Sequence, residues 1–163
     1  LPRVDTAAQC AQAIAHLRYP PEGDRGVAAS NRARGWSTRT GSFTDANREI
    51  AAVVQIESEE AVESVEEIAA VEGVDALFVG PSDLSHSLGV PGELESPVFT
   101  DALARVLEAA RAHDLAAGIL ATNPERARAF MDQGFTLMVL SADVNMLAAA
   151  ARDAVTRTRG GAA

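Results

Sequence analysis

Short apolar runs alternate with longer helical patterns four times along this chain, and that rhythm constrains the fold more than any other feature. The runs lack the polar alternation of a half-exposed strand, as expected of parallel strands that helices cover. They lie at 53–56, 76–79, 117–121 and 136–140. Strand and helix patterns in this succession are typical of βα units, so we predict an α/β fold with a parallel sheet.

Local signals mark where the predicted helices begin and end. Thr6 is a candidate N-cap of the first helix, and Asn123 followed by Pro124 predicts the start of a helix that Gly134 ends. In the second helix five glutamates lie opposite an apolar face, which indicates a solvated surface. The predicted helices cover residues 7–17, 59–71, 98–113, 124–133 and 145–157.

The stretch 18–47 interrupts this rhythm with prolines, glycines, serines and five arginines. Connections of this length inside a compact domain are usually functional or mobile. Arg18 and Arg25 flank its YPPEGDRG turn, where they face a substrate, brace a subunit contact or lie in solvent.

Composition excludes several classes of function. A net charge of -9 argues against nucleic acid or an anionic membrane as the main partner, since both would repel the chain. All 14 basic residues are arginines, which excludes a Schiff-base, pyridoxal-phosphate or phosphate-loop lysine in this sequence. Cys10 is the single cysteine and is interpreted as a core residue. No apolar run approaches the roughly 20 residues of a membrane span, and we expect a cytoplasmic enzyme or binding domain.

Two architectures are compatible with four or five βα units. A complete, open doubly wound sheet suits 163 residues, whereas a TIM barrel needs eight units and typically about 250 residues. Length alone favours the open sheet. The opening residues Leu1-Pro2-Arg3-Val4, however, resemble the end of a strand, as in a barrel cut within a strand. In either case we expect one domain over residues 1–163.

Acidic residues follow two consecutive predicted strands. Glu57 comes directly after the run 53–56, and Asp83 follows the next run after a Gly-Pro-Ser turn. Parallel sheets bind ligands at the carboxyl ends of their strands, and neighbouring strands lie about 4.8 Å apart. Two carboxylates at this edge would therefore suit one hard divalent cation, magnesium or manganese rather than zinc.

A second interpretation of the same residues involves no metal. Glu57 would favour the positive end of the helix that follows it, and Asp83 would be the N-cap of a turn over 84–88. Gln55 alternates with Ile56 and so shares the side of Glu57, where a buried amide needs a partner. Gln55 thus adds weight to the metal interpretation without deciding the question.

Several motifs resemble one known family. VQIES, EGVDALFVGPSDLSHSLGVPG, RYPPEGDRGV and AAGILATN are similar, in order and spacing, to motifs of the HpcH/HpaI aldolase (citrate lyase-like) family. Within it, the chain resembles 2-keto-3-deoxy-sugar-acid and 4-hydroxy-2-oxo-acid aldolases more than citramalyl- or malyl-coenzyme A lyases. The resemblance implies a homo-oligomeric TIM barrel. It also implies a class II aldolase that cleaves 2-oxo-4-hydroxy acids to pyruvate and an aldehyde through a metal-stabilised pyruvate enolate.

The resemblance also implies a role for individual residues. Glu57 and Asp83 match the family's two protein ligands of the divalent metal, Mg²⁺ or Mn²⁺, with Co²⁺ also possible. The pyruvate carboxylate would dock at one glycine and one backbone amide, and the aldehyde end would approach a leucine that is equally well interpreted as core. The implied substrate-binding residues are Gln55 beside the metal, Gly80, the amide of Ser82, and Leu120.

The resemblance begins at the fourth strand of the family's barrel and runs through the helix after the eighth. The histidine base, its acidic partner and the oxyanion arginine of the family belong to a segment that these residues do not match. We therefore expect no confident catalytic residue here, a truncated chain that is inactive by itself, and an uncovered apolar face. His86 is a weak candidate base, and His16 and His113 are interpreted as surface or packing residues.

Two other functions remain open at this stage. The chain could be a non-catalytic α/β domain in which Glu57 and Asp83 bind a metal or a small acid without turnover. It could also be a citramalyl- or malyl-coenzyme A-type lyase, although the acidic balance of the chain disfavours a basic nucleotide pocket.

Overall fold

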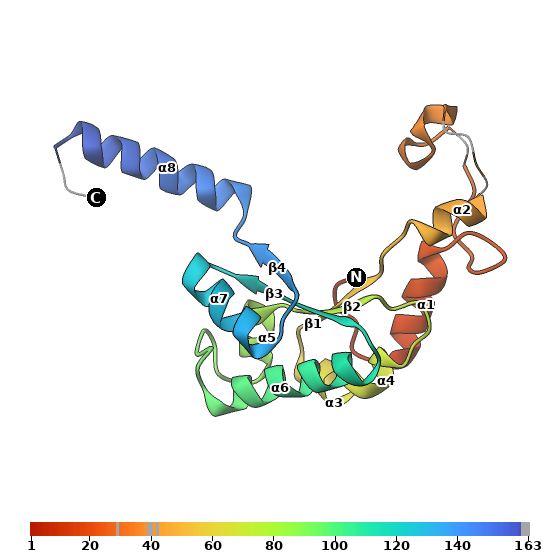
Figure 1. The fold of residues 1–163 in the computed structure, drawn as a ribbon, viewed down its shortest axis with the longest axis horizontal. Coiled ribbons are helices and arrows are strands. Elements are labelled where there is room, and N and C mark those ends of the chain that lie inside the picture. The colour runs from red at the N-terminus through yellow and green to blue at the C-terminus, as the bar shows by residue number, and fades with distance from the viewer. Residues whose placement is uncertain (29, 39–40, 42, 161–163) are drawn as a thin grey trace.

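The computed structural model of the chain describes residues 1–28, 30–38, 41 and 43–160, with the backbone alone at 33, 34 and 44. Its centre is a parallel sheet with the strand order β1-β2-β3-β4 (Figure 1). The predicted strands are confirmed to within one residue at their ends. Their bounds are β1 Val53–Ile56, β2 Ala76–Val79, β3 Ala116–Ala121 and β4 Leu137–Leu140.

The first residue extends this sheet beyond β1. The Leu1 amino group donates to the Val53 carbonyl at 2.7 Å, and the Gln55 amide donates to the Leu1 carbonyl at 2.9 Å. This is the alternating pattern of a parallel ladder. No strand is assigned at residues 1–4, so among the opening residues these two bonds show strand-like pairing for Leu1 alone. Two residues later Arg3 adopts a left-handed φ of 58°.

Helices precede or follow the strands much as the sequence predicts. The capping box at Thr6, the N-cap at Asn123 and the left-handed C-cap at Gly134 are all present. The connection 18–47, in contrast, is not devoid of structure, because it contains the 3-10 helix η1 Arg32–Ser37 and the start of α2. The α-helices are α1 Ala7–Leu17, α2 Phe43–Arg48, α3 Glu59–Glu63, α4 Val65–Ala69, α5 Pro81–Ser87, α6 Pro97–Ala112, α7 Pro124–Gln133 and α8 Asp143–Thr158.

The single helix predicted over 59–71 is wrong in one respect. Ser64, with φ -101° and ψ 11°, separates α3 from α4. Val62 and Val65 on either side of the break are both buried, so one apolar face continues across it. Apolar periodicity reports that face and not a local change in ψ, which is why the sequence pattern did not indicate the break.

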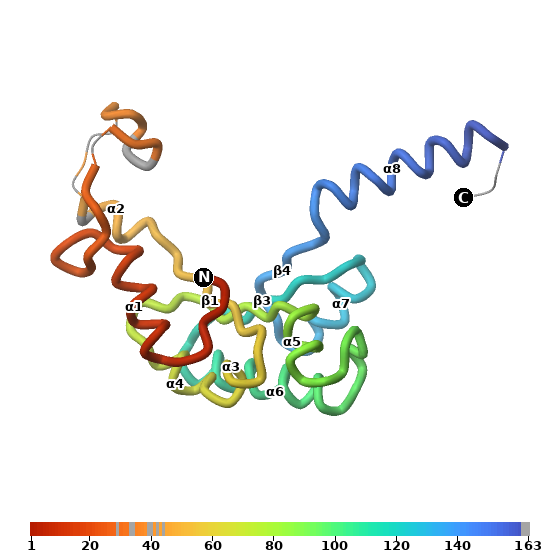
Figure 2. The backbone as a smooth tube through the Cα atoms, turned by 180° about the vertical axis from the view of Figure 1, so that it is seen from behind, coloured from red at the N-terminus to blue at the C-terminus, as the bar shows by residue number. Residues whose placement is uncertain are grey.

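Helices cover one face of the sheet. Val54, Ile56, Leu77 and Val79 have no exposed surface and form the core with α4 and α6, which lie on one side of the strands in Figure 2. The opposite face carries the row Gln55, Phe78, Gly118 and Leu137, which are register partners. One covered face and strands in sequential order are features of consecutive units of a TIM-type barrel. The open doubly wound alternative, with helices on both faces and a reversed strand order, is wrong.

The last helix packs differently from the others. α8 projects away from the sheet (Figures 1 and 2) and has no buried residue among those described. The exposed apolar side chains of this region are Leu137, Val139 and Leu140 on β4 and Val144, Met146, Leu147 and Val155 on α8. Over the described residues, no helix combines the length and apolarity that crossing a membrane requires.

Candidate functional site

The carboxylate of Glu57 lies at the carboxyl end of β1 and is held by two donors. The side chain is buried, Oε1 accepts from the Arg3 amide at 2.8 Å, and Oε2 accepts from Nε2 of Gln55 at 2.6 Å. The predicted shared side of Gln55 and Glu57 is therefore confirmed. A carboxylate has about four lone-pair sites, so both oxygens keep acceptor capacity for a cation.

Gly80 closes one side of this arrangement. It follows β2 and is the N-cap of α5, with an ordinary φ of -94°. A Cβ at this position would lie 2.8 Å from Nε2 of Gln55 and 3.1 Å from Oε2 of Glu57. A side chain at this position would therefore require Gln55 to shift, so space and not backbone conformation favours glycine here. The structure brings Gly80, Gln55 and Glu57 together.

Asp83 reaches the same region from α5. The helix begins at Pro81, so Asp83 lies in its first turn and the interpretation of Asp83 as an N-cap is wrong. The reason is that Pro81 is preorganised for the first helical position, so the helix begins before Asp83 and not after it. The alternative for Glu57 stays open, because Glu57 directly precedes Ser58, the N-cap of α3, while its oxygens bond to Arg3 and Gln55.

Glu57 and Asp83 line one cleft of about 530 Å³. Its lining contains five carboxylates but only one arginine and one histidine, so its charge favours a cation. Oxygen donors suit a hard cation, and magnesium is commonly bound by one or two carboxylates together with water or substrate. The lining residues are Arg3, Asp5, Glu57, Ser58, Glu59, Glu60, Asp83, His86 and Ser87.

The donor set therefore fits a divalent metal with two protein ligands. Within the described ranges, no cluster of three or more histidine, cysteine, aspartate or glutamate side chains is arranged to hold a metal ion. A cation between Glu57 and Asp83 would take its remaining ligands from solvent or substrate.

The predicted residues Ser82 and Leu120 lie on two different elements, and neither is part of the cleft lining. Ser82 is exposed in the first turn of α5, where its amide has no carbonyl partner within the helix. Leu120 is half-buried on β3, opposite Val139 of β4, and is not part of the cleft lining. Of the predicted site residues, Glu57 and Asp83 line the cleft, whereas Gln55, Gly80, Ser82 and Leu120 are not part of its lining.

Three residues of the cleft were missed or undervalued by sequence reasoning. His86 lies three residues after Asp83 on α5, a spacing that places both on one helix face. Arg3 and Asp5 follow the segment that pairs with β1, so the strand-end rule would have found them. His16, bonded to Asp24 at 2.7 Å, and His113, the C-cap of α6, lie outside the cleft as expected.

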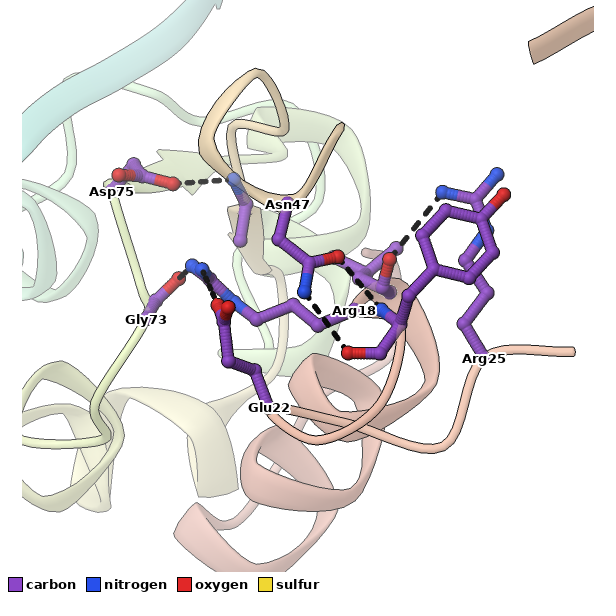
Figure 3. Close-up of polar contacts among 9 residues, drawn as sticks. Arg18, Glu22, Arg25, Asn47, Gly73 and Asp75 are labelled. Carbon is purple, nitrogen blue, oxygen red and sulfur yellow. Dashed lines mark hydrogen bonds and ion pairs between the residues drawn. The ribbon is translucent and has the colours of Figure 1, made fainter. Parts of the chain in front are cut away.

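Arg18 and Arg25 make contacts within the chain (Figure 3), and neither is among the residues that line the cleft. Arg18 donates to the Gly73 carbonyl at 3.3 Å, ahead of β2 and so at the amino end of the sheet. The guanidinium of Arg25 lies 4.7 Å from the centre of the Tyr19 ring. Of the three interpretations offered for these arginines, substrate contact is the one that their positions disfavour.

A second hollow, of about 590 Å³, adjoins Arg18 and Gly73. It is the larger of the two, but it lies at the amino ends of the strands. The guanidinium of Arg18 in it is engaged by the Gly73 carbonyl and by Glu22 at 3.8 Å. Ligands of parallel α/β sheets and barrels bind at the carboxyl ends, so we assign the functional site to the cleft at Glu57.

Comparison with known proteins gives consistent matches. The sequence model described as HpcH/HpaI aldolase/citrate lyase matches residues 1–150. The 5-keto-4-deoxy-D-glucarate aldolase of Klebsiella pneumoniae subsp. pneumoniae is 42% identical over 150 residues, covering 92% of this chain and 59% of that protein. An Escherichia coli O139:H28 protein of the same name is 41% identical with the same coverage. The chain thus spans about three-fifths of the length of these curated relatives.

Two solved structures also match most of this chain. An HpcH/HpaI aldolase/citrate lyase family protein from Burkholderia cenocepacia has a TM-score of 0.89 and 40% identity, over 96% of this chain and 63% of its own. An HpcH/HpaI aldolase from Desulfitobacterium hafniense has a TM-score of 0.83 and 29% identity, over 98% of this chain and 62% of its own. Both sequence and fold therefore point to the same group of proteins.

Proposed function

This chain belongs to the HpcH/HpaI aldolase/citrate lyase family, and from that premise we propose that it carries the metal and pyruvate site of a class II aldolase. The reaction would be carbon-carbon cleavage of a 2-oxo-4-hydroxy acid to pyruvate and an aldehyde. The observation that carries the proposal is that Glu57 and Asp83, from the ends of two neighbouring strands, line one acidic cleft. The absence of lysine from the sequence excludes a Schiff base formed by this chain.

Glu57 and Asp83 would hold Mg²⁺ or Mn²⁺, with Co²⁺ also possible. The cation would act as a Lewis acid, stabilising negative charge on the 2-oxo oxygen as the C3–C4 bond breaks. Gln55 and the Arg3 amide each donate to one oxygen of Glu57 and so hold its carboxylate in one orientation. This restraint reduces the reorganisation that cation binding would otherwise require.

The pyruvyl end of the substrate would lie beside α5. Gly80 leaves space next to Glu57 that a side chain would fill, and the amide of Ser82 is a donor without a partner inside its helix. We propose that these two residues receive the substrate carboxylate. Leu120 lies outside the cleft lining, so we propose for it only a packing contact at the aldehyde end.

Cleavage also needs a base that removes the proton of the C4 hydroxyl. The described cleft contains no residue that matches the histidine base or the oxyanion arginine of the family. We propose that this chain by itself binds metal and pyruvate without turning over substrate. Pyruvate release from a 2-oxo-4-hydroxy acid by the 163-residue chain with magnesium would contradict this.

The metal site is tested by two conservative substitutions. Calorimetric titration with Mn²⁺ and Mg²⁺ is expected to show one site, which Glu57→Gln and Asp83→Asn each weaken at least tenfold. Glu59→Gln is the matched control, because it removes the same charge from the same cleft. Equal loss in the control would indicate diffuse attraction in place of ligation. Pyruvate is expected to bind only when the metal is present.

The same titrations bear on the two competing functions. A non-catalytic binding domain would bind metal or small acids in any order, without the dependence of pyruvate on metal. A coenzyme A lyase would bind the nucleotide, which five carboxylates in the cleft disfavour.

We further propose that the protein is a homo-oligomer. The support is the exposed apolar surface of α8, represented by Val144 and Leu147, which a second copy would cover. Light scattering after size-exclusion chromatography tests this, and Leu147→Glu is expected to reduce the measured mass. The partners we propose are 2-oxo acids and further copies of this chain, with no nucleic acid or membrane, and the cytoplasmic location stays a prediction.

A further inference from the structure

We propose that Arg3 binds a second carboxylate of the substrate, at the end remote from the pyruvyl group, and so selects diacids among 2-oxo-4-hydroxy acids. The inference rests on the proposed function, because it takes Glu57 and Asp83 as the metal pair. It concerns a position for which the family resemblance gives no role. Arg3 would therefore be a specificity-determining residue.

The backbone of Arg3 is strained and is held in place from both sides. Its φ of 58° lies in the left-handed region, which residues other than glycine adopt only at an energetic cost. Leu1 before it pairs with β1, and the side chain of Val4 after it is buried. A glycine would relieve this conformation, so the backbone gives no reason for an arginine at this position.

The guanidinium of Arg3 is free to receive a ligand. Arg3 is exposed, and it is the one arginine among the described residues that line the cleft. Although five carboxylates share that lining, the guanidinium makes no ion pair or hydrogen bond with any described residue. Arginine is not deprotonated in proteins, so this positive charge does not depend on its surroundings. An unpaired cation in the cleft can therefore bind an anionic group.

Arg3 lies on the opposite flank of Glu57 from the proposed pyruvyl pocket. Leu1 pairs with one edge of β1, and β2 pairs with the other edge. The Arg3 amide donates to Oε1 of Glu57 at 2.8 Å, whereas Gly80, at the end of β2, adjoins Oε2. A substrate with its pyruvyl carboxylate at Gly80 would extend across the metal pair toward Arg3.

The shape and charge of this guanidinium favour a carboxylate as its partner. The planar fork of arginine matches the two oxygens of a carboxylate. A divalent cation between Glu57 and Asp83 would offset the charges of that pair. The carboxylates that then remain in the lining are Asp5, Glu59 and Glu60. Both glutamates are exposed, so solvent and salt screen them, whereas the guanidinium would act in direct contact with the substrate.

The decisive comparison uses two acids that differ in one group at their far end. In the presence of Mg²⁺, calorimetry measures the Kd of 4-hydroxy-2-oxohexanoate, which ends in a methyl group, and of 4-hydroxy-2-oxohexanedioate, which ends in a carboxylate. The 163-residue chain is expected to bind the diacid about 3- to 10-fold more tightly, the effect of a charge-assisted hydrogen bond. In Arg3→Met the diacid is expected to bind more weakly than the monoacid, because the remaining carboxylates then repel it.

Two further variants control this result. Arg128→Met removes the same charge from an exposed position on α7 outside the cleft, and it is expected to keep the preference for the diacid. Arg3→Gly suits the left-handed backbone and is expected to lose the preference as Arg3→Met does. In the wild type the preference is expected to shrink as the NaCl concentration rises. Equal loss in Arg128→Met would indicate diffuse attraction and overturn the assignment.

The remaining outcomes separate this inference from the proposed function. Arg3→Met keeps the amide that donates to Glu57, so the binding of Mg²⁺ and of pyruvate is expected not to weaken. A tenfold loss of Mg²⁺ affinity in this variant would show that Arg3 acts through Glu57 and overturn its role in recognition. Binding of Mg²⁺ and pyruvate by the wild type without preference for the diacid would overturn the role of Arg3 alone. Failure of the wild type to bind Mg²⁺ would overturn the proposed function, and this inference with it.

Discussion

The side-chain amide of Gln55 donates a hydrogen bond of 2.6 Å to Oε2 of Glu57, two residues later on the same side of β1. The other carboxylate oxygen accepts from the amide of Arg3, which lies 54 positions away in the chain. One carboxylate is thus oriented by a local donor and by a distant one. In the proposed function Glu57 is a metal ligand, and groups that orient such a ligand commonly change metal affinity 10- to 100-fold.

Removing the local donor tests this arrangement. Gln55→Ala is expected to weaken Mn²⁺ binding about tenfold, because Glu57 would lose one of its two restraints. The measurement is calorimetric titration, with the free energy of unfolding determined in parallel by urea. Gln12→Ala on the exposed surface of α1 is the control and is expected to change neither quantity. An unchanged Mn²⁺ affinity in Gln55→Ala would show that the Arg3 amide suffices.

A methyl group at position 80 is expected to disturb the same pair. In Gly80→Ala the new Cβ would lie 2.8 Å from Nε2 of Gln55, so that side chain must move away from Glu57. We expect a loss of about 1–3 kcal/mol in the free energy of unfolding and weaker Mn²⁺ binding. Gly26→Ala, where a Cβ meets nothing within 4 Å, is expected to leave both unchanged. If Gly80→Ala behaved like this control, the close approach of the new Cβ to Gln55 would affect neither stability nor Mn²⁺ binding, contrary to the prediction.

Cys10 is expected to be unreactive in the native protein. It is fully buried in α1, and desolvation by burial raises the pKa of its thiol. The thiolate is the reactive species, so modification by Ellman's reagent is expected to proceed only as fast as the chain opens, and at once in denaturant. Ala11→Cys, one residue further at an exposed position, supplies the comparison in a Cys10→Ala background. Equal rates of modification for Cys10 and for the cysteine at position 11 would contradict the burial of Cys10.

A surface ion pair gives a prediction about pH. Arg105 donates to both oxygens of Glu66, at 3.0 and 2.9 Å, and this hydrogen bonding lowers the pKa of Glu66 from its ordinary value of 4.5. A lowered carboxyl pKa stabilises the fold above pH 4.5, and the contribution is lost as the pH falls through the lower folded pKa. Because the pair is exposed, Arg105→Gln is expected to cost at most about 1 kcal/mol at pH 7.

This cost is measured as the difference in the free energy of unfolding between wild type and Arg105→Gln, from urea titrations at several pH values. The difference is expected to shrink below pH 4.5 and in high salt. In a Glu66→Gln background the dependence on pH is expected to vanish. A difference that persists there would have to come from the bond of Arg105 to the Glu63 carbonyl.

The parts of the fold that depend on local signals were predictable. Thr6, Asn123 and Gly134 mark helix ends through bonds to residues only a few positions away, and each was placed correctly. The break at Ser64 was not, because apolar periodicity is the same for a continuous and an interrupted helix face. The start of α5 at Pro81 was missed although proline at a first helical position is itself a local signal. The sequence of α8 has the apolar pattern of an ordinary helix, yet its apolar residues remain exposed in the structure. Periodicity identifies an apolar face but not what it packs against.

In the candidate site, too, some features were predictable from the sequence and others were not. Strand ends alone placed Glu57 and Asp83 at one edge of the sheet, because parallel strands share their direction and side chains alternate along them. The contact of Arg3 with Glu57, the place of His86 in the cleft and the position of Leu120 outside it were decided by tertiary structure. These relationships depend on how segments far apart in the chain pack together in space, and no local pattern of residues encodes such distances.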